Sequence, residues 1–241
     1  MKFVLVYARI YAECLKKAFK ALGKNAWTIF LPAILSVAFT LTASLLGAIP
    51  LIGPFLLGFV FDAALSSYLY FVGEVVANGR VSWSEFGKSL RAYFWSILNL
   101  LFVFWILDFV LGPALRANPN APLIRGLLGI AAFVLLNAVP EVLYQKGTFG
   151  GIATIQRTFQ FIQENWIEWF IPNLLLGGAA YEAYLFLGEQ ASNGLGPAAQ
   201  IAVSAVAGAL LHGVMVFRGF LFEVLDGSTH RQRMYRYRAP S

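Results

Sequence analysis

The most prominent pattern in the chain is a series of long apolar stretches separated by short polar turns. A helix needs about 20 residues to cross the hydrocarbon core of a bilayer, and six stretches reach that length. We place these stretches at Ala26–Gly47, Gly53–Val75, Ala92–Gly112, Leu123–Tyr144, Trp166–Gly188 and Pro197–Leu221. Backbone polar groups in lipid must be satisfied within their own segment, so each stretch must be helical. The sequence therefore predicts an all-α integral membrane protein with six transmembrane helices arranged as three hairpins.

Amphipathic segments precede the hairpins. From Thr148 to Pro172 the chain first alternates apolar and polar residues at helical spacing and then becomes continuously apolar. The apolar face of this segment contains Ile152, Ile155, Phe159 and Ile162. The same design is present from Phe3 to Lys24, and a looser version begins with the capping box Ser82–Glu85. These patterns predict three helices that lie on the membrane surface and then turn into a spanning helix.

The amphipathic segments and hairpins together form a weak internal repeat. A shift of 140 residues aligns Phe19 with Phe159, Asn25 with Asn165, Phe30 with Phe170 and Pro32 with Pro172. Each hairpin also ends in Glu-Val, an aliphatic residue and, after a short spacer, glycine; these glycines are Gly79, Gly147 and Gly227. We therefore expect a single membrane domain built from pseudo-repeats at roughly 1–79, 80–147 and 148–227, followed by a basic tail at 228–241.

Composition and charge determine the class and the expected orientation. The chain is 59% hydrophobic and only 12% charged, which excludes the class of soluble globular proteins. Apart from Arg116 and Arg125, every lysine and arginine falls in the N-terminal segment, the second and fourth loops, or the region from the inner end of the last span onward. By the positive-inside rule, both termini face the cytoplasm and the protein lies in the cytoplasmic (inner) membrane.

The net charge of +6 makes anionic lipid headgroups the expected partners of this basic surface. The candidate lipid-binding or partner-binding residues are Lys16, Lys17, Lys20, Lys24, Arg218, Arg231, Arg233, Arg236 and Arg238. The tail alternates cations with aromatic residues, a pattern that also suits RNA. Its position beside the membrane favours lipid headgroups or an acidic protein, and no nucleic acid is expected. Small residues in the second, fifth and sixth spans predict close helix packing, or contact with partner subunits or a second copy.

Two ionisable residues form a candidate site inside the membrane. Asp62 precedes Glu74 by twelve residues, and His212 precedes Glu223 by eleven, so both lie near the middle of the bilayer. Such a pair carries protons or binds a cation in some membrane proteins. The competing interpretation is an interhelical hydrogen bond that fixes packing, and we favour it because no further polar chain leads to either surface.

The sequence contains no pattern typical of an enzyme. We find no phosphate-binding loop, no Gly-x-Ser-x-Gly motif, and no group of His, Cys and carboxylate residues at metal-ligand spacing. A lone Cys14 excludes an internal disulfide, and we expect it to be a passive apolar residue of the first surface helix. We therefore expect no cofactor, no metal and no enzymatic activity.

A glycine-containing turn, the helix "QRTFQFIQENW" and the Trp/Phe/Pro residues that lead into a span, within Gly147–Pro172, resemble a group of bacterial polytopic inner-membrane proteins. The group includes the YciC-like proteins and the membrane domain attached to some glycerophosphoryl diester phosphodiesterases. This resemblance implies a membrane module without chemistry of its own, and phosphodiesterase activity is not expected because no such soluble domain is present. We expect a non-enzymatic scaffold or accessory subunit of a membrane complex, with lipid-interacting amphipathic helices. The alternative is a small transporter or channel with a central Asp62/His212 site, and a lipid-modifying enzyme is third.

Overall fold

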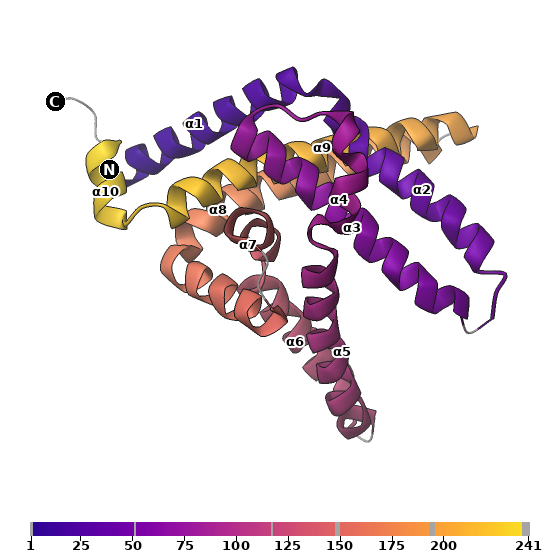
Figure 1. Cartoon of the computed structure of the whole chain (residues 1–241). Coiled ribbons are helices and arrows are strands. Elements are labelled where there is room, and N and C mark those ends of the chain that lie inside the picture. The colour runs from indigo at the N-terminus through magenta and orange to yellow at the C-terminus, as the bar shows by residue number, and fades with distance from the viewer. Residues whose placement is uncertain (1, 51, 117, 148–149, 193–195, 238–241) are drawn as a thin grey trace.

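The computed structural model describes residues 2–50, 52–116, 118–147, 150–192 and 196–237, and these residues contain helices and no strand (Figure 1). The first helices are α1 (Lys2–Lys24), η1 (Ala26–Phe30), α2 (Leu31–Leu46) and α3 (Ile52–Asn78). The middle of the chain contains η2 (Trp83–Glu85), α4 (Phe86–Ala92), α5 (Phe94–Arg116), α6 (Ala121–Leu135) and α7 (Val139–Lys146). The last helices are α8 (Gly151–Ser192), α9 (Gly196–Asp226) and α10 (His230–Arg236). Thr148, where the third amphipathic segment was expected to begin, and Arg238 lie outside the described residues.

Three helical hairpins extend from a common centre. The α2–α3 and α5–α6 hairpins point in clearly different directions, and the second part of α8 runs beside α9 (Figure 1). Within the described residues, five segments are long and apolar enough to cross a membrane: Ala26–Leu46, Ile52–Asn78, Trp83–Arg116, Ala121–Lys146 and Ala202–Asp226. The second part of α8, which contains the polar residues Asn173 and Glu182, is not among them. The prediction of an all-α protein with membrane-spanning helices is confirmed, whereas the count of six spans is not.

The fourth expected span is a broken helix, which corrects the prediction of one continuous helix from Leu123 to Tyr144. α6 ends at Leu135, and α7 begins at Val139 with Pro140 in its first turn. Proline has no backbone N–H, so the helical hydrogen bond from position 140 to the Leu136 carbonyl cannot form. The Leu136 carbonyl instead accepts the N–H of Val139 at 3.1 Å. The break places Asn137 between two short helices.

Each surface helix meets its spanning helix at a single residue with a non-helical backbone. Asn25 has φ −126° and ψ 43°, Tyr93 has φ −120° and ψ 4°, and Asn165 has φ −134° and ψ 18°. Both asparagine side chains donate to the carbonyl four residues earlier, Ala21 for Asn25 at 2.8 Å and Phe161 for Asn165 at 3.1 Å. The Ala21 carbonyl also accepts the backbone N–H of Asn25 at 3.1 Å, so the side-chain bond fixes the asparagine to the last turn of α1 at the change of direction.

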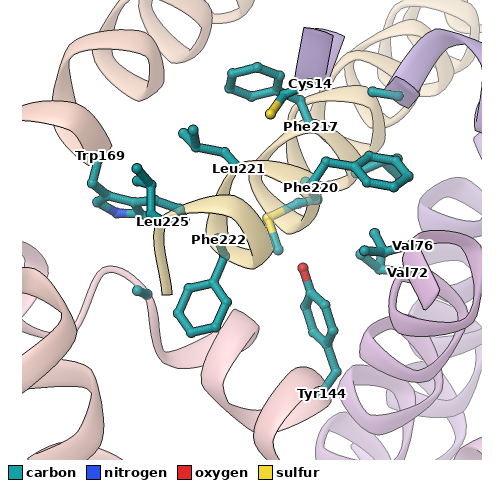
Figure 2. Close-up of a cluster of buried hydrophobic side chains, with 14 of the residues drawn as sticks. Cys14, Val72, Val76, Tyr144, Trp169, Phe217, Phe220, Leu221, Phe222 and Leu225 are labelled. Carbon is teal, nitrogen blue, oxygen red and sulfur yellow. The ribbon is translucent and has the colours of Figure 1, made fainter. Parts of the chain in front are cut away.

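The hydrophobic core lies at one end of the molecule, where α1, α3, α7, α8 and α9 meet (Figure 2). Its largest fully buried side chains include Phe161, Trp169, Phe217 and Phe222, and Phe71 lies in a separate small cluster with Leu31 and Tyr70. In the most apolar part of α9, 44% of the residues are buried, against 11% in the segment that contains α2 and 17% in the segment that contains α5. α9 is therefore the central helix. The outer halves of the hairpins expose large apolar side chains, among them Leu45, Phe55, Phe109, Leu123 and Leu175. Such a surface is unfavourable in water but matches the hydrocarbon of a bilayer.

Two glycines allow three helices to meet in this core. Tyr144 of α7 points toward α9 beside Val72 and Val76 of α3 (Figure 2). A Cβ atom on Gly219 of α9 would lie 2.6 Å from Val76 Cγ2 and 2.7 Å from the Tyr144 hydroxyl. A Cβ on Gly73 of α3 would lie 3.2 Å from the Tyr144 side chain. The crossing of α3, α7 and α9 therefore depends on the absence of side chains at both positions.

The first helix has three faces rather than the two expected. Ile10 and Cys14 are buried against the core, and the apolar Val4 and Phe19 are exposed. Charged side chains such as Lys20 form a third, exposed face. Burial raises the pKa of the Cys14 thiol to about 12, so the cysteine is an unreactive part of the core. α1 thus packs on the protein, and its remaining apolar face is open to lipid.

Candidate functional site

Asp62 and His212, the pair proposed from the sequence, are both buried, but no hydrogen bond joins them in the described structure. His212 Nε2 lies 3.1 Å from the Thr28 hydroxyl, and the ring packs edge-on against Tyr68 at 5.8 Å between centroids. The Oδ1 atom of Asp62 has no hydrogen-bond partner. The histidine therefore makes an interhelical hydrogen bond between α9 and η1, with Thr28 rather than Asp62 as its partner.

The principal buried charges are Arg218 of α9 and Glu141 of α7. Arg218 donates from Nε to Glu141 Oε1 at 2.8 Å and from Nη2 to Glu141 Oε2 at 2.9 Å. The Glu141 side chain is fully buried, and 13% of the Arg218 side chain is exposed. A bidentate pair of this kind combines two charge-assisted hydrogen bonds with a fixed orientation. It joins α7 to α9, within two of the segments that are long and apolar enough to cross a membrane.

The helix break and a tryptophan complete the surroundings of this pair. Arg218 Nη2 also donates to the backbone carbonyl of Asn137 at 2.6 Å. Trp169 of α8 donates its indole N–H to Asn137 Oδ1 at 3.0 Å, and the Arg218 guanidinium lies 5.0 Å from the centre of its ring. The pair is thus surrounded by partners from α7, α8 and α9, which is the condition for keeping a charge pair in a membrane interior.

A second ionic contact holds the ends of three helices together. The Asp226 carboxylate, at the end of α9, pairs with Lys146 of α7 and Arg157 of α8. Only 5% of the Asp226 side chain is exposed, whereas the two cations are about one-third exposed. The contact therefore lies at the edge of the core and closes the end of the bundle where α7, α8 and α9 meet.

A third polar group joins the first and last helices. Glu168 of α8 accepts a hydrogen bond from the Tyr7 hydroxyl at 2.8 Å and lies near His230 (3.6 Å) and Arg233 (4.0 Å) of α10. The Tyr7 oxygen is also 2.9 Å from His230 Nδ1. Burial and the bond to Glu168 raise the pKa of Tyr7 to about 12, so its hydroxyl remains protonated and donates to the carboxylate. α1 and α10 are consequently held side by side.

The basic residues proposed from the sequence divide into exposed and buried groups. The exposed ones within the described chain are Lys16, Lys17, Lys20, Lys24, Arg231 and Arg236. Arg218 is held by Glu141, and Arg233, which is 3% exposed, donates to the carbonyls of Leu225 and Ser228 at 2.8 Å each. Arg218 and Arg233 therefore do not belong to the exposed basic surface on which the sequence analysis placed them.

Two hollows flank the first helix. The one that we call the terminal pocket has a volume of about 360 Å³ and is bounded by α1, the end of α9 and α10. The other, which we call the apolar groove, has a volume of about 460 Å³ and lies between α1, α8 and α9. Leu15 and Phe19 of α1 face Ala179 of α8 and Ala209 and Gly213 of α9 across the groove. The small residues of α8 and α9, expected to permit close helix contact, here leave space.

The sequence analysis missed the buried Glu141–Arg218 pair, although it contained a signal for it. Glu141 falls within the fourth expected span, Leu123–Tyr144, where an ionisable residue is a candidate site by default. The sequence analysis treats it only as part of the Glu-Val motif that ends each hairpin, because the corresponding glutamates, Glu74 and Glu223, stand near helix ends. In the structure Glu223 is exposed and Glu74 is partly exposed, and of the three only Glu141 is buried.

The described residues contain no group of three or more His, Cys, Asp or Glu side chains that could hold a metal ion. Comparisons of the chain with protein-family models, with curated proteins and with solved structures find no match. By the length and composition of its helices, the chain belongs to the class of all-α membrane proteins.

Proposed function

We propose that this protein is a non-enzymatic membrane scaffold or accessory subunit, whose outer hairpin surfaces receive lipid or a partner subunit. The observation that carries the proposal is the confinement of the core to one end of the molecule. Beyond that end α2 and α5 expose most of their apolar side chains, and few other parts of the chain pack on them. An exposed apolar surface of this extent matches hydrocarbon or the apolar surface of another membrane protein.

Six membrane crossings with both termini on one side are part of this proposal. Contacts between α1 and α10 support it, because the Tyr7 hydroxyl lies 2.9 Å from His230 and Arg9 donates to the Tyr237 carbonyl at 3.4 Å. Two ends of a chain that touch lie on the same side of the membrane, which requires an even number of crossings. Five apolar segments therefore need a sixth, and the second part of α8, paired with α9, is the available helix. The basic residues near the termini favour the cytoplasmic side.

The three pseudo-repeats remain part of the proposal and gain support from backbone geometry. Asn25, Tyr93 and Asn165 stand at corresponding positions and adopt similar non-helical φ and ψ values. The first two units also end in glycines with positive φ, 65° at Gly79 and 93° at Gly147. Gly227 ends the third unit without this conformation. We infer that each unit is a surface helix, a kink and a hairpin.

The six-span topology is tested with single cysteines in a Cys14→Ala background. Ser84→Cys is placed before α4, Asn118→Cys between α5 and α6, and Ser192→Cys at the end of α8. We expect a membrane-impermeant maleimide to label positions 118 and 192 in intact spheroplasts, and position 84 only after permeabilisation. Labelling of position 192 only after permeabilisation would mean that α8 does not cross, and the six-span proposal would be wrong.

The scaffold role is tested by mild extraction of the native protein followed by mass spectrometry of the co-purifying molecules. We expect stoichiometric partner subunits or a homo-oligomer, together with bound phospholipid, because the hairpin surfaces are apolar and largely unpacked. Purification as a bare monomer that retains neither partner nor lipid would contradict the proposal. A control extraction in harsh detergent shows whether any partner that is found depends on the native fold.

The transport alternative rests on the buried Asp62 carboxylate, and the geometry gives it less support. His212 is engaged by Thr28, and no hydrogen-bonded chain continues from Asp62 in the described residues. The broken helix at Asn137 is a feature that transporters share. Here the backbone carbonyl and the side-chain oxygen of Asn137 accept hydrogen bonds from Arg218 and Trp169. The break is therefore part of a closed packing contact.

A further inference from the structure

The terminal pocket combines a concentration of positive charge with an unsatisfied buried donor. Lys17 of α1 and Arg233 and Arg236 of α10 line it, against the single carboxylate of Glu223. Three cations on two helices from opposite ends of the chain thus surround one hollow. Mutual repulsion disfavours such an arrangement unless an anion is shared between them.

Arg233 supplies the observation that points to a ligand. Its side chain is 3% exposed, and Nη1 is fixed by the Leu225 and Ser228 carbonyls. Nη2 is only within 4.0 Å of Glu168, and the Nε–H has no hydrogen-bond partner. A buried charged donor that remains unpaired is costly, so the native state gains when an acceptor reaches it.

Arg233 lines two hollows, and the charges around them favour an anionic acceptor in only one of the two. Arg233 also lines a second hollow, of about 470 Å³, on the other side of the turn between α9 and α10. That hollow is bordered by the carboxylates of Glu164 and Asp226, which repel an anion. The terminal pocket instead brings Lys17 and Arg236 to the same space, and both side chains are exposed, Lys17 in a solvent-exposed ion pair with Glu13 at 3.2 Å.

We propose that the terminal pocket binds a phosphate group, held jointly by Lys17, Arg233 and Arg236. Phosphate oxygens accept several charge-assisted hydrogen bonds at once and are matched by arginine in particular. Because Lys17 belongs to α1 and the two arginines belong to α10, the bound phosphate joins the first helix to the last. This inference deepens the proposed lipid interaction of the basic surface, and it rests on that surface facing the membrane boundary.

The phosphate comes either from an anionic phospholipid headgroup or from a free phosphate, and the experiment separates these sources. Purified full-length protein is placed in nanodiscs of phosphatidylcholine, with or without phosphatidylglycerol, and inorganic phosphate is added in a parallel series. Thermal unfolding and native mass spectrometry report binding. If phosphatidylglycerol stabilises the protein and inorganic phosphate does not, the site binds a lipid headgroup. Stabilisation by inorganic phosphate in phosphatidylcholine assigns it to a free anion.

Matched variants decide whether the pocket is responsible. Arg236→Gln and Lys17→Gln each remove a cation from the pocket, whereas Arg80→Gln and Arg91→Gln remove exposed cations that lie outside it and outside the proposed lipid-binding residues. We expect about tenfold weaker binding in the first two variants, the effect of one charge-assisted hydrogen bond, and little change in the others. Equal loss in all four variants, or no loss in Arg236→Gln, would overturn the proposal.

The isolated protein is used, so the result does not depend on partner subunits. If Arg236→Gln loses phosphate binding but still co-purifies with its partner subunits, the phosphate site is supported whichever subunits these are. Specific phosphate binding by a protein that purifies as a bare monomer, with neither partner nor lipid, would leave the pocket intact and remove the scaffold role. Unfolding of each variant without added ligand shows whether its fold is maintained.

Discussion

Replacing Glu141 with leucine should unfold most of the protein or sharply lower its melting temperature. The substitution leaves the Arg218 guanidinium buried beside an apolar side chain, with only the Asn137 carbonyl and the Trp169 ring as partners. Removing one member of a buried ion pair typically costs about 3–5 kcal/mol. Thermal unfolding of the purified protein, followed by tryptophan fluorescence, measures the change.

Two controls identify the buried charge as the cause. The double variant Glu141→Leu/Arg218→Met replaces both charges with apolar groups and should recover most of the lost stability, since desolvation of the pair is then avoided. Glu13→Gln breaks the exposed Glu13–Lys17 pair of α1 and should cost less than about 1 kcal/mol. If the double variant were as unstable as Glu141→Leu, the isolated charge would not be the source of the instability.

Replacing Gly219 with alanine should also destabilise the fold strongly, although alanine is the better helix former. The added methyl group would lie 2.6 Å from Val76 Cγ2 and 2.7 Å from the Tyr144 hydroxyl, so these two side chains, or the helices that carry them, must shift away from α9. Overpacking of a core commonly costs about 1–3 kcal/mol. The expected result is a lower melting temperature and easier proteolysis of α7.

Gly178→Ala is the matched control for this substitution. Gly178 lies in α8 and is exposed, and a methyl group added there would have no atom of a neighbouring element within 4 Å. Here the higher helix propensity of alanine, worth about 1 kcal/mol, should leave stability unchanged or raise it. Equal behaviour of the two variants would show that the crossing of α3, α7 and α9 is looser than its geometry indicates.

The hairpins were predictable because apolar length alone determines whether a segment can cross a membrane. The kink at Asn165 was likewise visible in the match of Asn165 to Asn25 and in the change from amphipathic to continuously apolar sequence. The break at Asn137 was not expected, because the fourth span was drawn across Pro140 on apolar length alone, although a proline inside a helix removes a backbone hydrogen bond. Local sequence therefore predicted where the helices lie better than where they are interrupted.

The candidate site was less predictable, because it depends on how helices rotate about their axes. Asp62 and His212 were paired by their equal depth, but depth does not specify which neighbour a side chain faces. In the structure His212 faces Thr28, and Arg218 faces Glu141, 77 residues away in sequence. The terminal pocket was only partly foreseen, since exposed and buried arginines alternate within the short helix α10. Such pairings come from tertiary packing and leave no local pattern.

The central position of α9 has a consequence for how the protein is made. α9 follows α1, α3, α7 and α8 in the chain, so these helices leave the ribosome before their common partner exists. Glu141 precedes Arg218 by 77 residues, an interval on the order of ten seconds at common rates of synthesis. During that time a carboxylate in a membrane helix lacks its counter-charge. Nascent chains that stall or end before α9 should therefore be especially good substrates for membrane proteases.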